Sequence, residues 1–272
     1  MKISFSTLAC PDWTLAQATA IASSSGYDGI ELRFVENEDS LWKLPAFSGS
    51  QLPSPKRLLQ DHGLVISCVD TSCRFHSPDP KERERWIEEG VRMADLAAAL
   101  EAPGIRVFGD TIQLGATRDM TRTWIADSIR CLAEKIAPTG VEVWLETHAD
   151  FAGAEETASI LSEAGNSRAG TLWDPANCYI ESKERPQEGA GRLGNSIRHM
   201  HFKDLLIEQN KWTPVLTGEG NFALQEVQAA LQQIGYQGFV SFEWEKKWHP
   251  EIPDASVALP HFARWWRENS AQ

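Results

Sequence analysis

The sequence of 272 residues predicts one α/β domain with the (β/α)8 fold, a TIM barrel that spans residues 1–272. Three observations predict it. Short apolar runs with strand character alternate with helical patterns along the whole chain. This alternation indicates parallel strands joined by right-handed crossovers. The length is usual for one such barrel, and polar residues gather at the ends of the later strands, where barrel enzymes keep their active sites.

The strands are expected where short apolar runs are bounded by turn residues. The eight expected strands are Lys2–Ser6, Gly29–Arg33, Leu64–Asp70, Ile105–Gly109, Val141–Thr147, Gly170–Asp174, Ile197–Lys203 and Phe239–Trp244.

Helical patterns separate these strands, and glycines such as Gly26 and Gly165 follow them, where a left-handed C-cap favours glycine. The polar segment Glu181–Asn195 is expected to be a loop after the sixth strand. The seven expected helices are Leu15–Ser25, Pro55–His62, Lys81–Leu100, Thr117–Ala137, Ala154–Ala164, Ala223–Ile234 and Ala255–Glu268.

Composition narrows the functional class. The formal net charge of −12 disfavours a nucleic-acid partner, because such proteins need a basic surface to meet phosphates. The five cysteines are scattered without a CxxC pair, as expected of reduced thiols in a cytoplasm. No apolar run is long enough to span a membrane, and the first residues read as a strand rather than a signal peptide. We therefore expect a cytoplasmic protein without membrane contact, and the sequence leaves its oligomeric state open, a homo-oligomer included.

Strand alternation places several polar side chains on the inner face near the carboxyl-terminal mouth. In the fifth strand Glu146 and His148 share the inner face, because the outer face must be apolar where helices cover it. The sixth strand ends at Asp174, the seventh directs His201 and Lys203 inward, and the eighth directs Glu243 inward.

A divalent metal ion accounts for this set of side chains. Three carboxylates close together in a partly dry site are costly unless a cation neutralises them. We expect Glu146, Asp174, His201 and Glu243 to bind one ion. Ligands rich in carboxylate with one imidazole favour Mn²⁺ or Mg²⁺, and Co²⁺ and Zn²⁺ are compatible with them. No organic cofactor is expected.

The sequence resembles the sugar phosphate isomerase/epimerase superfamily, whose barrel is like that of xylose isomerase. The resemblance covers nearly the whole chain. It implies that Glu146, Asp174, His201 and Glu243 are the metal ligands. Ketose 3-epimerases of this superfamily have a histidine and an arginine where this sequence has Asn177 and Ile207, so the resemblance is to the superfamily. The segments that carry it are Gly29–Arg33, Leu145–His148, Trp173–Asn177, His199–Asp204, Gly218–Gly220 and Phe242–Lys246.

Six further polar residues are candidates for contacts with a substrate. Each also has an ordinary structural interpretation: Glu31 with Arg33 as an internal ion pair, Arg106 with a carboxylate neighbour, and Lys203 as the counter-charge of a carboxylate. The six candidates are His148, Lys203, Arg106, Glu31, Arg33 and Asn177.

The preferred function is a metal-dependent isomerase or epimerase of a small sugar or keto-sugar derivative. It would act through an enediolate, with Glu146 and Glu243 as acid and base. The alternative is a metal-dependent lyase, a dehydratase or decarboxylase of an oxidised sugar on the same scaffold. An apurinic-site endonuclease would need more histidines than the seven present and a basic groove. A sugar-binding protein without catalysis is a further interpretation, which only a test of turnover separates from an enzyme.

Overall fold

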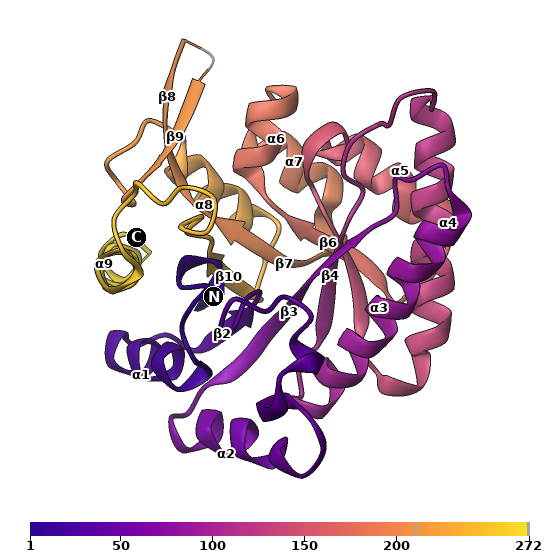
Figure 1. Ribbon diagram of the computed structural model, residues 1–272. Helices are drawn as coiled ribbons and strands as arrows, with labels where there is room; N and C mark the ends of the chain where they lie inside the picture. Colours follow the sequence, from indigo (N-terminus) through magenta and orange to yellow (C-terminus); the bar gives the residue numbers. More distant parts are fainter. Residues whose placement is uncertain (210, 271–272) are drawn as a thin grey trace. The chain divides into compact units, whose positions relative to one another are not determined.

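The structure is a computed structural model that describes residues 1–209 and 211–270, and its elements follow the expected alternation (Figure 1). All eight expected strands are present, and their ends shift by a few residues. They are β1 (Lys2–Phe5), β2 (Gly29–Leu32), β3 (Val65–Arg74), β4 (Gly104–Phe108), β5 (Glu142–Glu146), β6 (Ala169–Trp173), β7 (Ile197–Phe202) and β10 (Phe239–Phe242).

The seven expected helices are also present. Capping explains several of their ends: Thr14 and Gln17 form a capping box at the start of α1, and Gly26 ends that helix with φ 76°. The seven are α1 (Leu15–Ser25), α2 (Pro53–Asp61), α3 (Pro80–Ala99), α4 (Arg118–Ile136), α5 (Ala154–Ala164), α8 (Leu224–Gln233) and α9 (Ala255–Asn269).

Two parts of the secondary structure differ from expectation. The segment expected to be a loop, Glu181–Asn195, contains helix α7 (Pro186–Leu193), which follows a short helix α6 (Pro175–Ser182). The two glycines of α7 hide its helical pattern in the sequence. In the structure, a proline in the first turn and a hydrogen bond from Arg185 N to Glu188 Oε2 stabilise the start of α7.

An antiparallel hairpin after β7 was not expected at all. It consists of β8 (Asp204–Glu208) and β9 (Lys211–Val215), and in Figure 1 it projects away from α8 and α9. Its alternation of apolar and polar residues is too short and too irregular to indicate strands from the sequence alone.

The chain divides into a terminal unit, Met1–Ser67 with His201–Gln272, and a central unit, Cys68–Met200. In the terminal unit, β1 pairs in parallel with β10, and Ser6 beyond β1 forms a parallel bridge to Glu31 in β2. In the central unit, β3, β4, β5, β6 and β7 pair in parallel in this order. Parallel pairing is what the alternation of strands and helices predicted.

Aromatic packing fixes which face of the terminal strands points toward the helices. Phe202 and Phe242 both pack on Phe262 of α9, with ring centroids 5.7 and 4.6 Å apart. Because side chains alternate along a strand, the neighbouring positions His201 and Ser241 lie on the other face. The sequence predicted this assignment of faces, and it determines where the polar side chains of β7 and β10 lie.

The remaining general features concern the cysteines and the helices. All five cysteines are free, and four of them are buried. Burial raises the pKa of the Cys178 thiol well above its usual range, so this thiol is not a nucleophile at neutral pH. Within the described residues, none of the helices is both long enough and apolar enough to traverse a bilayer.

Candidate metal centre

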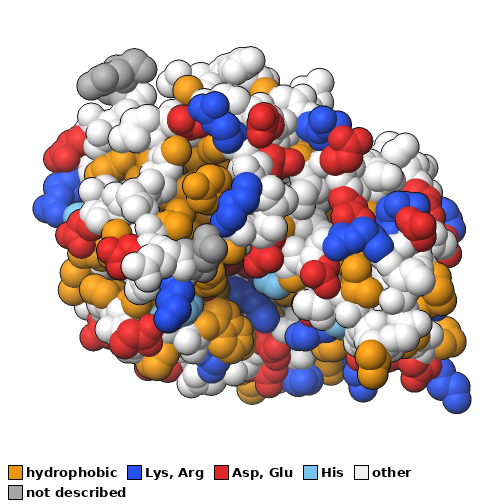
Figure 2. Space-filling model, turned by 90° about the horizontal axis from the view of Figure 1, so that it is seen from above, with side chains coloured by type: hydrophobic (Ala, Val, Ile, Leu, Met, Phe, Trp, Pro, Cys, Tyr) orange, Lys and Arg blue, Asp and Glu red, His pale blue; other side chains and the backbone are white. Residues whose placement is uncertain are grey.

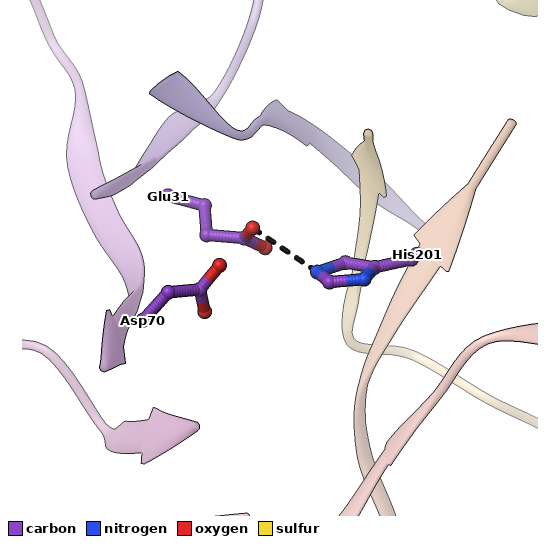
Figure 3. Close-up of side chains that lie close together, drawn as sticks. All are labelled: Glu31, Asp70 and His201. Atoms are coloured by element: carbon purple, nitrogen blue, oxygen red, sulfur yellow. Dashed lines mark hydrogen bonds and ion pairs between the residues drawn. The ribbon is translucent and has the colours of Figure 1, made fainter. Parts of the chain in front are cut away.

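His201, in the terminal unit, is a buried histidine with a carboxylate on each side of its ring. It is fully buried on β7, and its two ring nitrogens face two different carboxylates. Nε2 lies 3.1 Å from Oε1 of Glu31, as Figure 3 shows, and Nδ1 lies 3.2 Å from Oε1 of Glu243. A carboxylate that is ionised only accepts hydrogen bonds, so Glu31 assigns the hydrogen to Nε2. In a neutral ring, which is the form that binds a metal ion, Nδ1 would direct its lone pair toward Glu243.

The contact between Nδ1 and Glu243 tests whether these residues suit a metal ion. A nitrogen and a carboxylate oxygen buried 3.2 Å apart need a positive charge between them, which either a proton on Nδ1 or a metal ion supplies. Ligands at right angles around one ion, at about 2.1 Å each, are separated by roughly 3.0 Å. The separation in this structure is therefore suitable for two ligands of one divalent ion, and Glu31 is suitably placed to orient the imidazole.

A lysine holds the other oxygen of Glu243. Nζ of Lys203 lies 2.7 Å from Oε2 of Glu243 and 2.6 Å from Oε1 of Glu245. The side chain of Lys203 is only 3% exposed, so this ammonium is a largely desolvated counter-charge. The expected role of Lys203 as the partner of a neighbouring carboxylate is consistent with these contacts.

In the central unit, Arg106 joins two carboxylates. Nη2 lies 3.2 Å from Oδ2 of Asp70 in β3, and Nη1 lies 3.3 Å from Oε2 of Glu146 in β5. All three side chains are at most 3% exposed, and the guanidinium also lies over the Phe108 ring. The sequence required a carboxylate neighbour or an anionic ligand for Arg106, and the structure provides two carboxylates.

Asn177 connects the two candidate ligands of the central unit. Its backbone N–H donates to Oδ1 of Asp174, 2.9 Å away, and its side-chain Nδ2 donates to Oε1 of Glu146 over 3.4 Å. Asp174 is the N-cap of α6, and Pro175 at the first helical position fits that start. The cap bond accounts for one of the two carboxylate oxygens. The short sequence from Asp174 to Asn177 therefore explains both the helix start and the fixed position of the carboxylates.

Two further candidates have looser surroundings. His148 is half-buried after β5, and its ring lies 4.7 Å from that of Phe108. Arg33 is buried after β2, lies over the Phe34 ring and faces Asp39 at 3.8 Å. His148 and Arg106 both contact the ring of Phe108 in the central unit. Arg33 lies in the terminal unit, as Glu31 does.

Sequence reasoning did not single out Asp70 and Glu245. Asp70 ends the expected third strand and is fully buried against Arg106, so the need to neutralise Arg106 was a usable signal. Glu245 follows the end of β10 by three residues, where strand alternation no longer applies. Its contact with Lys203 depends on a loop that the sequence pattern does not define.

Comparisons with known proteins agree with this fold. The sequence matches the family described as "Xylose isomerase-like TIM barrel" over residues 19–268. The chain belongs to this family, and the expected (β/α)8 TIM-barrel fold is confirmed. No curated protein matches the sequence.

Several solved structures have the same fold. The probable 3-DHS dehydratase AsbF from Bacillus anthracis has a TM-score of 0.81 and 20% identity, with 99% of each chain covered. The IOLI protein, solved with a zinc atom, has a TM-score of 0.79 and 19% identity, covering 97% of this chain and 96% of that one. A D-allulose 3-epimerase from Methylomonas sp. has a TM-score of 0.78 and 19% identity, covering 99% and 97%. At these identities the likeness concerns the fold.

Proposed function

We propose that the protein is a divalent-metal-dependent isomerase or epimerase of a small sugar or keto-sugar derivative. The observation that carries the proposal is the buried imidazole of His201, held by Glu31 and directed at Glu243. An arrangement of this kind resembles the carboxylate–histidine pairs that orient the ligands of metal ions. Membership of the xylose isomerase-like family supports the same interpretation.

The four proposed ligands are Glu146, Asp174, His201 and Glu243. Three oxygen ligands and one nitrogen favour Mn²⁺ or Mg²⁺, with Co²⁺ or Zn²⁺ as acceptable substitutes. The IOLI protein, which shares the fold, was solved with zinc. When bound, the ion would hold a carbonyl and a hydroxyl oxygen of the substrate and stabilise the negative charge that develops on them.

The protein side chains perform the proton transfer. Glu243 is held through Oε2 by Lys203, and Glu146 is held through Oε2 by Arg106 and through Oε1 by Asn177. These donors fix the position of each carboxylate, and an ionised carboxylate can act as a base. We propose that one glutamate removes a proton from the carbon next to the carbonyl and that the other returns it.

Six side chains are proposed to line the substrate site. For three of them, Glu31, Arg106 and Lys203, the contacts described above also support a role in orienting carboxylates. For the others, substrate contact is the main proposal. The six are His148, Lys203, Arg106, Glu31, Arg33 and Asn177.

The surface charge supports a small molecule as the partner. The net charge is −12, and on the face drawn in Figure 2 the Lys and Arg side chains are interspersed with Asp and Glu. A surface of this kind does not attract the phosphates of nucleic acid. We propose a carbohydrate substrate, a cytoplasmic location and no nucleic-acid or membrane partner.

A lyase on the same scaffold is the second candidate. One solved structure with the same fold is that of a probable dehydratase, and another is that of an epimerase in complex with D-allulose. A lyase shares the first proton removal and differs in the group that leaves afterwards. The two functions therefore predict the same residues and different products.

The decisive experiment is a screen of ketoses, aldoses and keto-acids with Mn²⁺, followed by NMR in D₂O. An isomerase or epimerase gives a product of unchanged composition with deuterium at the carbon next to the carbonyl. Loss of water or carbon dioxide would establish the lyase instead. No turnover of any compound, with the metal bound, would favour a sugar-binding protein.

A further inference from the structure

Glu245 is a partly buried carboxylate to which the proposed reaction assigns no role. Its side chain is 14% exposed, and Oε1 lies 2.6 Å from Nζ of Lys203. The same nitrogen lies 2.7 Å from Oε2 of Glu243. One ammonium therefore joins a proposed metal ligand to a second glutamate two residues further along the chain.

The other side of Glu245 is fixed as well. Its backbone carbonyl accepts hydrogen bonds from the N–H groups of Trp248 and His249, which closes a turn after β10. Its Oε2 faces Nε2 of His249 at 3.7 Å, and the His249 ring packs edge-on against Trp212 of β9, with centroids 5.6 Å apart. The backbone of Glu245 is thus held by its own turn, and its carboxylate faces His249, which the hairpin β8–β9 contacts through Trp212.

We propose that Glu245 is a positioning residue that holds Lys203 against Oε2 of Glu243, so that Oε1 of Glu243 is presented to the divalent ion. The inference rests on the proposed metal site. A lysine side chain has four rotatable bonds and loses much entropy when it is fixed. A second carboxylate on the far side restricts that motion and keeps the ammonium between the two glutamates.

Glu245 influences the metal site by its contact with Lys203, and its negative charge alone is not sufficient. A negative charge near a cation site strengthens binding of the cation by simple attraction, wherever it is placed. The positioning role instead requires a side chain long enough to contact Lys203, and it requires Lys203 to be present. These two requirements separate the mechanisms experimentally.

The first test measures Mn²⁺ binding by calorimetry on the full-length protein. Glu245→Asp keeps the charge and shortens the reach, and it should weaken Mn²⁺ binding about tenfold, as is typical when a partner of a metal ligand is changed. Glu251→Gln is the matched control. Glu251 faces Nδ1 of His249, at 3.2 Å, and is 63% exposed. Its affinity should stay within about twofold of the wild type.

The second test is a double-mutant cycle. Glu245→Gln should weaken Mn²⁺ binding about tenfold when Lys203 is present and less than about twofold in a Lys203→Met background. An equal loss in both backgrounds would show that only the charge matters and would overturn the proposal. Thermal melting of each variant reports whether it is folded. If Lys203→Met does not fold, Glu245→Asp decides, because unchanged affinity in that variant also overturns the proposal.

Binding of Mn²⁺ by the wild type shows whether a negative result concerns the metal site or only the role of Glu245. If the wild type binds no divalent ion, the metal site itself is wrong, and the positioning role falls with it. If the wild type binds Mn²⁺ and both Glu245 variants bind it equally well, the metal site stands and only the role of Glu245 is wrong.

Discussion

Nε2 of His201 lies 3.1 Å from Oε1 of Glu31, and both side chains are fully buried. The two residues are 170 positions apart in the sequence, on β7 and β2. In the neutral imidazole this contact favours the hydrogen on Nε2, which leaves Nδ1 as the nitrogen that can bind a metal ion.

This pair gives the first prediction. Glu31→Ala removes the acceptor of the Nε2 hydrogen, and it should weaken Mn²⁺ binding about 10- to 100-fold. Glu31→Gln keeps an oxygen acceptor and should bind within several-fold of the wild type. Calorimetry of the three proteins measures the effect. Equal affinities for Glu31→Ala and the wild type would show that Glu31 does not orient the ligand.

The second prediction concerns the proposed ligands themselves. Purified protein should bind about one divalent ion per chain, and His201→Ala or Asp174→Ala should abolish the binding because each removes a ligand atom. His62→Ala is a suitable control, because His62 is exposed and its ring nitrogen Nδ1 contacts the backbone carbonyl of Leu58. Calorimetry after dialysis against a chelator checks both. Normal binding by His201→Ala would exclude the proposed site.

Much of the fold follows from local signals. The eight strands and seven of the helices were predicted because apolar runs and helical patterns alternate, and Gly26 marked a helix end that the structure confirms. The hairpin β8–β9 and the helices α6 and α7 were missed. The alternation of apolar and polar residues is weak in these segments. Tertiary contacts, such as that of Trp212 in β9 with His249, contribute to their structure and cannot be seen in the local sequence.

The site was predictable to the extent that strand alternation defines a face. His201 lies opposite Phe202 on β7 because a period of two requires it. The partner of each polar group was not predictable, since it depends on side-chain reach and on strands distant in sequence. Arg106 illustrates the difference: the sequence required an anionic partner, but only the structure identifies Asp70 and Glu146.

The third prediction concerns stability. Arg106→Met leaves Asp70 and Glu146 buried without their shared counter-charge, and it should lower the free energy of unfolding by about 3–5 kcal/mol. Arg130→Met, which breaks an exposed pair with Asp127, should cost less than about 1 kcal/mol. Urea unfolding without metal compares them. Saturating Mn²⁺ should raise the stability of the wild type and of both variants, because it binds only the folded state. If the two variants lose similar amounts of unfolding free energy, Arg106 is not the counter-charge that stabilises Asp70 and Glu146.

The fourth prediction concerns pH. Burial raises the pKa of the Asp204 carboxyl above its usual range, although the N–H groups of Gly220, Gly218 and Leu205 partly oppose the shift. The folded state therefore takes up this proton at higher pH than the unfolded state. The contribution to stability is present below the unfolded pKa and is lost as the pH rises through the folded pKa.

Asp204→Asn should accordingly destabilise the protein by about 1–3 kcal/mol, because the amide cannot accept from all three backbone donors. The difference from the wild type should grow as the pH falls from 7 toward the unfolded pKa of Asp204. Glu134→Gln, at an exposed position of α4, should show neither effect. Urea unfolding at several pH values measures this, and a difference that shrinks on acidification would show that the sign is wrong.

The last prediction concerns proton transfer by Glu146 and Glu243. Each carboxylate is held through one oxygen by a buried cation: Glu146 by Arg106 and Glu243 by Lys203. Glu→Gln at either position keeps an oxygen ligand but removes the base. Each variant should fold and retain some metal affinity, yet lose about 100-fold or more in turnover. Glu142→Gln is the matched control, because Glu142 lies on the same strand as Glu146 and pairs with Arg198.

Isotope exchange decides whether these glutamates act as bases. In D₂O the wild type should place deuterium on the carbon next to the carbonyl, and both Gln variants should lose this exchange together with turnover. The Glu142→Gln control should keep both. If product forms without deuterium and both Gln variants keep near-normal rates, general-base catalysis is excluded. A hydride shift between adjacent carbons would then be the better mechanism, because it moves hydrogen from one carbon to the next without exchange with water.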